Sequence, residues 1–142
     1  MKIAIGTDHR GFVYKEYIKK YYAQHEWIDV GAHSEERTDY PLYAMQVVHL
    51  MCTKNVACAV LLCGTGSGMA IAVNRHSLLY AAVAWNSDVA RRVKEEDNCN
   101  VLVIPADCVS QQEVLLIIDA WLQAEFKGGR YAQRLAMIDT VR

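Results

Sequence analysis

A cysteine followed directly by a glycine-rich loop is the part of the sequence best suited to chemistry. Cys63 ends an unbroken apolar run that begins at Ala57, and the segment 64–68, Gly-Thr-Gly-Ser-Gly, follows it. Glycine lets a backbone turn tightly and approach a ligand closely. The apolar segment 69–73 predicts a helix, whose free N–H groups and positive dipole end favour an anion on the loop. A thiol beside such a helix start has a lowered pKa, and its thiolate could act as a general base.

Both features also have a plain structural explanation. The segment 64–68, called the glycine loop below, could be only a tight turn between a strand and a helix. Cys63 could be only a buried thiol that packs like a small hydrophobic residue. The loop does not fit the known nucleotide-binding loops, because no Lys-Ser or Lys-Thr pair follows the glycines and Met69 stands where the dinucleotide fingerprint needs a third glycine. We therefore favour a small phosphorylated ligand over a structural turn.

Two other groups of polar residues could contribute to an anion site. Arg130 and Arg134 lie four residues apart on a predicted helix, and two adjacent guanidinium groups repel one another unless an anion lies between them. A solvated basic helix face explains this pair equally well. Asp8 and His9 follow the first predicted strand, at the edge where open α/β sheets bind ligands. If all these groups gather with Cys63 at one sheet edge, they form a sugar-phosphate site.

Alternating strand and helix patterns predict how these residues are positioned. The expected strands are 2–6, 27–31, 57–63, 78–84 and 101–104. The expected helices are 12–25, 41–54, 69–74, 87–96, 110–126 and 131–138, with an N-cap at Ser87 or Asp88 and a capping box at Ser110 and Glu113. The first helix should pack an aromatic face on the sheet, formed by Tyr14, Tyr17, Tyr21 and Tyr22. Short connections between alternating elements imply one five-stranded parallel sheet with helices on both faces.

Length and composition restrict the class of protein. The 142 residues predict one domain, 1–142, and a hydrophobic content of 53% predicts a globular chain. The formal net charge of -1 argues against binding to nucleic acid or to an acidic membrane surface. We expect no signal peptide and no membrane span. The five cysteines follow no metal-site or disulfide pattern, which favours reduced thiols in the cytoplasm, with Cys52 and Cys58 as inert buried residues.

The chain resembles the ribose-5-phosphate isomerase B family, which includes the galactose-6-phosphate isomerase subunits. The resemblance covers nearly the whole length and is carried by the segments 6–12, 37–41, 63–68, 100–102 and 128–130, together with Ala72, Asn74 and Arg134. It implies an α/β, Rossmann-like three-layer sandwich and an aldose-ketose isomerase, an intramolecular oxidoreductase. It also implies a homodimer or homotetramer that needs no metal and no cofactor and acts on a small-molecule sugar phosphate.

The resemblance further implies a role for individual residues. The cysteine that matches Cys63 removes the proton alpha to the carbonyl and moves it between C1 and C2 through a cis-enediolate. The hydroxyl of Thr65 and the N–H groups of the glycine loop stabilise the oxyanion. The neighbouring subunit completes each site, among others with the arginines that match Arg130 and Arg134. The residues expected to bind substrate are Asp8, His9, Gly64, Gly66, Ser67, Gly68, Asp97, Arg130 and Arg134.

Three acidic residues depart from the pattern of many relatives. The family's His-Asn pair before the last strand falls on Glu96 and Asp97, and that histidine is thought to open the furanose ring. Glu96 could still transfer a proton if burial raised its pKa, so it is a third catalytic candidate. A frequent phosphate-binding arginine falls on Asp107, where Arg10 or Arg37 could substitute for the missing cation.

Three functions remain open from the sequence. The first is interconversion of ribose 5-phosphate and ribulose 5-phosphate, in the non-oxidative branch of the pentose phosphate pathway. The second is isomerisation of a hexose 6-phosphate such as galactose or allose 6-phosphate, because the changed positions could reshape the pocket. The third is a weakly active sugar-phosphate-binding subunit, suggested by Glu96, Asp97 and Asp107.

Overall fold

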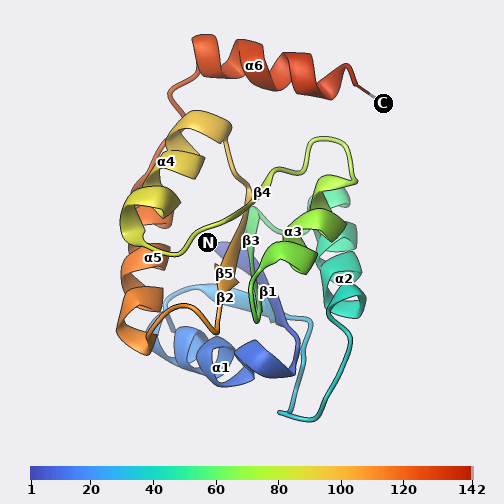
Figure 1. Ribbon diagram of the computed structural model, residues 1–142, viewed down its shortest axis with the longest axis vertical. Helices are drawn as coiled ribbons and strands as arrows, with labels where there is room; N and C mark the ends of the chain where they lie inside the picture. Colours follow the sequence, from blue (N-terminus) through green and yellow to red (C-terminus); the bar gives the residue numbers. More distant parts are fainter. Residues whose placement is uncertain (142) are drawn as a thin grey trace.

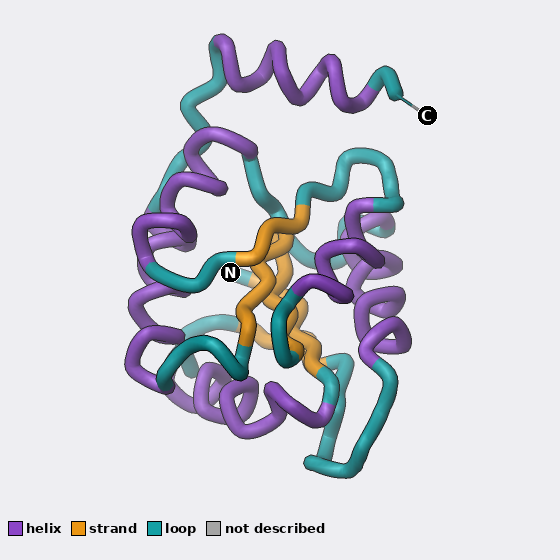
Figure 2. The backbone as a smooth tube through the Cα atoms, in the orientation of Figure 1, coloured by secondary structure: helices purple, strands orange, loops and turns teal. Residues whose placement is uncertain are grey.

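The computed structural model describes residues 1–141 and contains one sheet of five parallel strands (Figures 1 and 2). The strands are β1 (Lys2–Thr7), β2 (Glu26–Asp29), β3 (Cys58–Cys63), β4 (Ala81–Val83) and β5 (Val101–Pro105), in the order β2-β1-β3-β5-β4. The helices are α1 (Phe12–Tyr21), α2 (Tyr40–Cys52), α3 (Ser67–Asn74), α4 (Ser87–Asp97), α5 (Gln111–Gln123) and α6 (Arg130–Asp139), and a short 3-10 helix, η1 (His9–Gly11), follows β1. The predicted α/β fold, with an all-parallel sheet, is confirmed.

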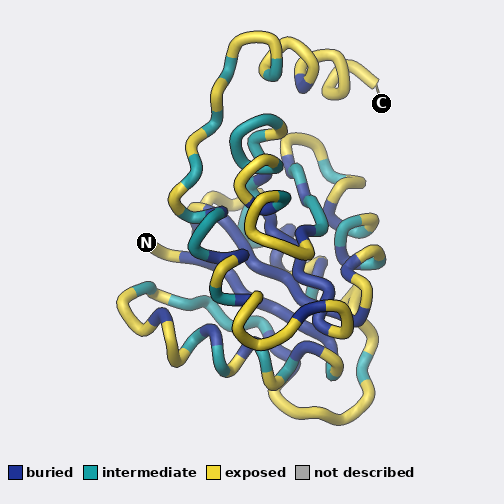
Figure 3. Tube along the Cα trace, turned by 60° about the vertical axis from the view of Figure 1, so that its left-hand side comes forward, coloured by how far each residue is buried: buried dark blue, intermediate teal, exposed yellow. Residues whose placement is uncertain are grey.

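Helices cover both faces of the sheet. One hydrophobic cluster packs α1, α4 and α5 on one face, and a second packs α2 and α3 on the other, so the core has three layers (Figure 1). Every residue of β3 and β5 is buried, as the unbroken apolar runs predict for central parallel strands. Helix α6 lies beyond these layers and is exposed along most of its length (Figure 3). No helix formed by residues 1–141 is long and apolar enough to span a membrane.

Several element boundaries differ from the predictions because side chains bond to the backbone. Strand β4 is shorter than 78–84, since Asn100 accepts a hydrogen bond from the N–H of Tyr80 and donates one to the carbonyl of Leu78. The N-cap of α4 is Asn86, whose side chain accepts from the N–H of Val89, so the two predicted caps were wrong. The capping box that opens α5 is confirmed.

Two expectations about burial were also wrong. Tyr22 is buried on the sheet side of α1, but the neighbouring Tyr21 is 58% exposed, because the helix ends there and its ring points away from the core. Cys52 is exposed at the end of α2, whereas Cys58 is buried as expected. The aromatic face of α1 is therefore narrower than the spacing of its tyrosines suggested.

Candidate active site

The carboxyl edge of the sheet holds Cys63 and the glycine loop. Cys63 ends β3 and lies in register with Pro105 at the end of β5. The N–H of Ala106 donates to the carbonyl of Cys63 at 2.9 Å, and the N–H of Asp107 donates to the carbonyl of Gly64 at 3.0 Å. The start of the loop is therefore fixed to the end of the neighbouring strand.

Two glycines of the loop are required by their surroundings. Gly66 adopts φ +80, a left-handed conformation, and a Cβ atom there would lie 3.0 Å from Cγ1 of Val83. Gly68 lies against the ring of Tyr40, at the start of α2, and a Cβ atom would come within 2.5 Å of that ring. The loop therefore turns tightly into α3, with Thr65 exposed between the two buried glycines Gly64 and Gly66.

The thiol of Cys63 faces the backbone amides of this turn. Hydrogen bonds from the N–H groups of Met69 and Gly66 act to lower its pKa. Burial has the largest effect and acts in the opposite direction, so the pKa of Cys63 is raised in a single subunit. The sequence-based expectation of a lowered pKa is wrong here, because Cys63 is only 5% exposed. The amides nevertheless point at the sulfur and would stabilise its thiolate.

Asp8 and His9 lie at the same edge, one strand away. Asp8 is buried and caps η1, with Oδ1 accepting from the N–H of Arg10 at 2.9 Å. The hydroxyl of Thr7 lies 2.9 Å from the carbonyl of Asp8 and 3.1 Å from the carbonyl of Leu62, so it can donate to either. These contacts fix the backbone at Asp8 against β3.

The ring of His9 is oriented by Thr38, which in turn contacts Tyr43; the sequence predicted no role for either residue. The N–H of Thr38 donates to Nδ1 of His9 at 3.3 Å, and the hydroxyl of Thr38 bonds to that of Tyr43 at 2.9 Å. A backbone N–H can only donate, so Nδ1 is the acceptor in this contact and Nε2 is the ring nitrogen left to donate. His9 can thus offer an N–H donor to a phosphate or hydroxyl oxygen. The only sequence signal for Thr38 was its place in the segment 37–41.

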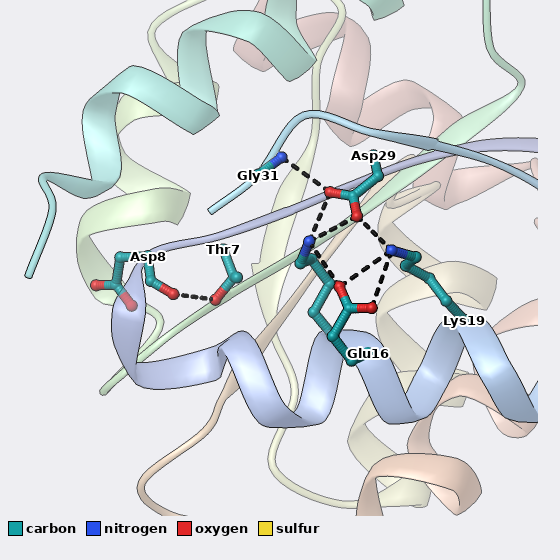
Figure 4. Close-up of polar contacts among 7 residues, drawn as sticks. Thr7, Asp8, Glu16, Lys19, Asp29 and Gly31 are labelled. Carbon is teal, nitrogen blue, oxygen red and sulfur yellow. Dashed lines mark hydrogen bonds and ion pairs between the residues drawn. The ribbon is translucent and has the colours of Figure 1, made fainter. Parts of the chain in front are cut away.

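A network of charges lies between α1 and the end of β2, where the loop that carries Thr38 begins (Figure 4). The ammonium of Lys15 is fully buried and lies 2.7 and 2.6 Å from the two carboxylate oxygens of Asp29. Asp29 also accepts from the N–H of Gly31 at 2.8 Å, and the carbonyl of Gly31 accepts from the N–H of Thr7 at 2.7 Å. The network therefore ties the end of β2 to the end of β1, next to Asp8.

Four of the expected site residues lie at the opposite edge of the sheet. Glu96 and Asp97 end α4, just before the chain enters the amino end of β5, and a strand of this length rises roughly 13 Å to the edge that holds Cys63. Arg130 and Arg134 lie on α6, beyond the amino edge (Figure 1). The expectation that all the groups gather at one edge is wrong for a single chain, because α4 runs antiparallel to the strands.

These four residues form a charged group of their own. Burial raises the pKa of Asp97, the charge of Glu96 raises it further, and the charge of Arg134 opposes both. A cavity of about 720 Å³ adjoins them, lined among others by Asp97, Tyr80 and Leu135. The expected site residues thus lie in two separate groups, which we call the thiol half-site (Cys63, the glycine loop, Asp8 and His9) and the distal half-site (Glu96, Asp97, Arg130 and Arg134).

A parallel α/β sheet that holds a thiol, a glycine loop and a helix start at its carboxyl edge defines a class of proteins that bind small anionic ligands. Comparison with known proteins gives the particular family. Residues 3–138 match the model of the Ribose/Galactose Isomerase family. The chain is 38% identical to ribose-5-phosphate isomerase B of Escherichia coli over 99% of its own length and 95% of that protein. It therefore belongs to the ribose/galactose isomerase family.

Solved structures agree with this assignment. The crystal structure of a ribose 5-phosphate isomerase from Thermotoga maritima superposes with a TM-score of 0.96 at 40% identity, over 99% of this chain and 98% of that one. A ribose-5-phosphate isomerase B from Mycoplasma genitalium with bound ribulose-5-phosphate gives a TM-score of 0.91 at 30% identity, over 98% and 94% of the two chains. The three-layer fold is shared throughout.

Proposed function

We propose that the protein interconverts ribose 5-phosphate and ribulose 5-phosphate, as a cytoplasmic enzyme of the non-oxidative pentose phosphate pathway. The observation that carries the proposal is the thiol of Cys63 at the carboxyl edge, with the N–H groups of Gly66 and Met69 directed at it. Relatives named for this activity cover almost the entire chain. All five cysteines are free thiols in the described chain, which suits a reducing compartment.

The reaction needs one base and a stabilised oxyanion. The Cys63 thiolate removes the proton from C2 of the open-chain aldose, and the electrons of that C–H bond form the enediolate while the carbonyl oxygen at C1 becomes an oxyanion. The amides of the glycine loop and the exposed hydroxyl of Thr65 donate to the oxygens as negative charge develops. The proton of the C2 hydroxyl then moves to the oxygen on C1, the thiol returns its own proton to C1, and the carbonyl forms at C2. Atoms and charge balance without any other reactant.

The proposed enzyme is a homodimer or a dimer of dimers in which each site joins two subunits. The thiol half-site of one subunit would meet the distal half-site of the other, with Arg130 and Arg134 on the phosphate, Asp97 on the sugar and Glu96 at the ring oxygen. Two supporting features are the separation of the half-sites within one chain and the exposed apolar residues Met137 and Ile138 on α6. A two-fold axis would form two such sites at once.

The chemistry is tested by hydrogen exchange. We expect the purified wild-type protein to exchange the C2 proton of ribose 5-phosphate with deuterium oxide, and Cys63→Ala to abolish this exchange while the circular dichroism spectrum is unchanged. Cys58→Ala removes a buried thiol from the other end of the same strand and should keep the activity. Full exchange by Cys63→Ala would contradict the role of the thiol. Galactose and allose 6-phosphate, measured side by side, test the hexose alternative suggested by Asp107.

The shared site is tested by complementation. We co-express Cys63→Ala with the double variant Arg130→Ala/Arg134→Ala, each of which should be inactive alone. Random pairing makes half of the dimers mixed, and each mixed dimer has one intact site of two, so roughly a quarter of the wild-type activity should return. Two different Cys63 variants, co-expressed as the control, should restore none. Activity of the double arginine variant alone, or no recovery in the mixture, would contradict a shared site.

A further inference from the structure

An ion pair lies across the start of the glycine loop. Arg10 in η1 donates from Nη2 to Oδ2 of Asp107, which follows β5, so the pair joins two elements 97 residues apart. A Cβ atom on Gly64 would come within 2.8 Å of both Nε of Arg10 and Oδ2 of Asp107. The pair therefore lies directly over the residue that follows Cys63.

The contact with Asp107 orients Arg10 but leaves most of its hydrogen-bond donors free. An arginine side chain has five N–H donors. Of the three side-chain nitrogens of Arg10, only Nη2 has a hydrogen-bond partner among residues 1–141. Its side chain is 53% exposed, and that of Asp107 is 38% exposed. The pKa of Arg10 is raised, mainly by the bond to Asp107 and in smaller part by the charges of Asp8 and Cys63. The guanidinium group is thus within electrostatic range of both site residues and still open to an anion.

We propose that Arg10, oriented by Asp107 across the glycine loop, binds the phosphate group of the substrate from the same subunit that supplies Cys63. The proposal rests on the proposed isomerase function. In a pentose 5-phosphate only C3, C4 and C5 lie between the reacting C2 and the phosphoester oxygen, so a cation next to Cys63 is within reach of the phosphate. The arginines of this chain's own distal half-site lie at the other edge of the sheet. Bidentate binding of a phosphate is the task for which guanidinium is best suited.

The pair also has a simpler explanation, in which Arg10 only neutralises Asp107. In that case Arg10→Ala would harm the enzyme by leaving a free carboxylate beside the thiol, and Arg10→Ala/Asp107→Ala would restore it. If Arg10 binds phosphate, the double variant stays impaired. The decisive comparison is therefore between the double variant and Asp107→Ala alone, since these two proteins differ only in Arg10.

The experiment measures kcat/KM of these variants with ribose 5-phosphate and with unphosphorylated D-ribose. We expect kcat/KM for ribose 5-phosphate to be about 10- to 100-fold lower in the double variant than in Asp107→Ala, mostly through KM, as for other charge-assisted bonds. With D-ribose the two variants should not differ. Arg75→Ala, an exposed arginine at the end of α3, is the control and should match the wild type.

Two outcomes would overturn the proposal: equal kcat/KM of the two variants with ribose 5-phosphate, or an equal loss with both substrates. A direct measurement separates this failure from failure of the proposed function. Calorimetric binding of inorganic phosphate to the full-length protein needs no turnover. It should be weaker in the double variant than in Asp107→Ala even if the wild type isomerises nothing, and equal affinities would again refute the role of Arg10.

Discussion

The substitution Gly66→Ala tests the physical account of the glycine loop. Position 66 has φ +80, and alanine in the left-handed region costs roughly 1–2 kcal/mol. The new Cβ atom would also lie 3.0 Å from Val83 and 3.2 Å from Val103, two residues held in β-strands, and such overpacking costs about 1–3 kcal/mol. We therefore expect a loss of about 2–5 kcal/mol in the free energy of unfolding.

Gly128→Ala is a matched control. Gly128 also has positive φ, +64, but a Cβ atom there would have no neighbour within 4 Å. Its substitution should cost only the backbone strain, so Gly66→Ala should be less stable than Gly128→Ala by about 1–3 kcal/mol. A protein of this size loses roughly 2–4 °C in Tm for each kcal/mol, which makes the difference measurable by thermal unfolding at a fixed protein concentration.

The same substitution should reduce activity, because the N–H of Gly66 is directed at the sulfur of Cys63. Alanine keeps the backbone N–H but shifts its position, so we expect a smaller loss than the about 10²- to 10³-fold fall in kcat that follows complete removal of one such donor. Equal stability of the two alanine variants would refute the packing argument. Unchanged kcat of Gly66→Ala with ribose 5-phosphate would refute the requirement for the exact position of this N–H.

Four further outcomes follow from the structure. Lys15→Met should lower the free energy of unfolding by about 3 kcal/mol, because it removes a fully buried ammonium group from its ion pair with Asp29. Lys20→Met on the exposed side of α1 should change it by less than about 0.5 kcal/mol. Burial opposes ionisation of Asp29, yet hydrogen bonds and charges from Lys15 and Lys19 lower its pKa on balance. The wild type should therefore lose stability as the pH falls through the pKa of Asp29. Acid titration of Lys15→Met should show a smaller loss of stability. Because burial raises the pKa of Cys63, kcat/KM should keep rising with pH beyond neutrality, and a plateau already at pH 7 would contradict this. Asn74→Ala removes two hydrogen bonds of 2.8 Å to the backbone of Ala81 and should cost about 2 kcal/mol in urea unfolding.

The fold could be predicted from the sequence because its strongest signals are local. The apolar run before Cys63 and the capping box at Ser110 each depend on residues close in sequence, and both are confirmed. The element ends were less predictable, since they depend on side chains from elsewhere. The start of β4 depends on Asn74 and Asn100, which come from two other parts of the chain.

Which candidate residues lie at the carboxyl edge could be predicted from the sequence, but the position of the other candidates could not. The residues at the carboxyl edge follow directly from strand order, because each comes at the end of a parallel strand. The pKa of Cys63 depends on its burial, which no sequence pattern measures. Arg130 and Arg134 lie on α6, which packs outside the three layers. The spacing of the two arginines in the sequence therefore could not predict at which edge of the sheet they lie.

The glutamate at the end of α4 gives the most specific remaining prediction, and it concerns ring opening. Ribose 5-phosphate closes to a furanose through its C4 hydroxyl, whereas ribulose 5-phosphate stays open because its C5 oxygen carries the phosphate. If Glu96 of the neighbouring subunit transfers the proton that opens the ring, Glu96→Gln should convert ribose 5-phosphate about 10²- to 10⁴-fold more slowly.

Deuterium exchange at C1 of ribulose 5-phosphate needs no ring opening, since it requires only the base and the enediolate. Glu96→Gln should therefore retain this exchange while net conversion falls. Glu95→Gln is the control, because Glu95 is bound by Arg91 and Lys127 and belongs to neither half-site. Equal losses of exchange and conversion in Glu96→Gln would place the defect at the enediolate step and exclude a role confined to the ring, because the exchange involves the base and the enediolate but no furanose.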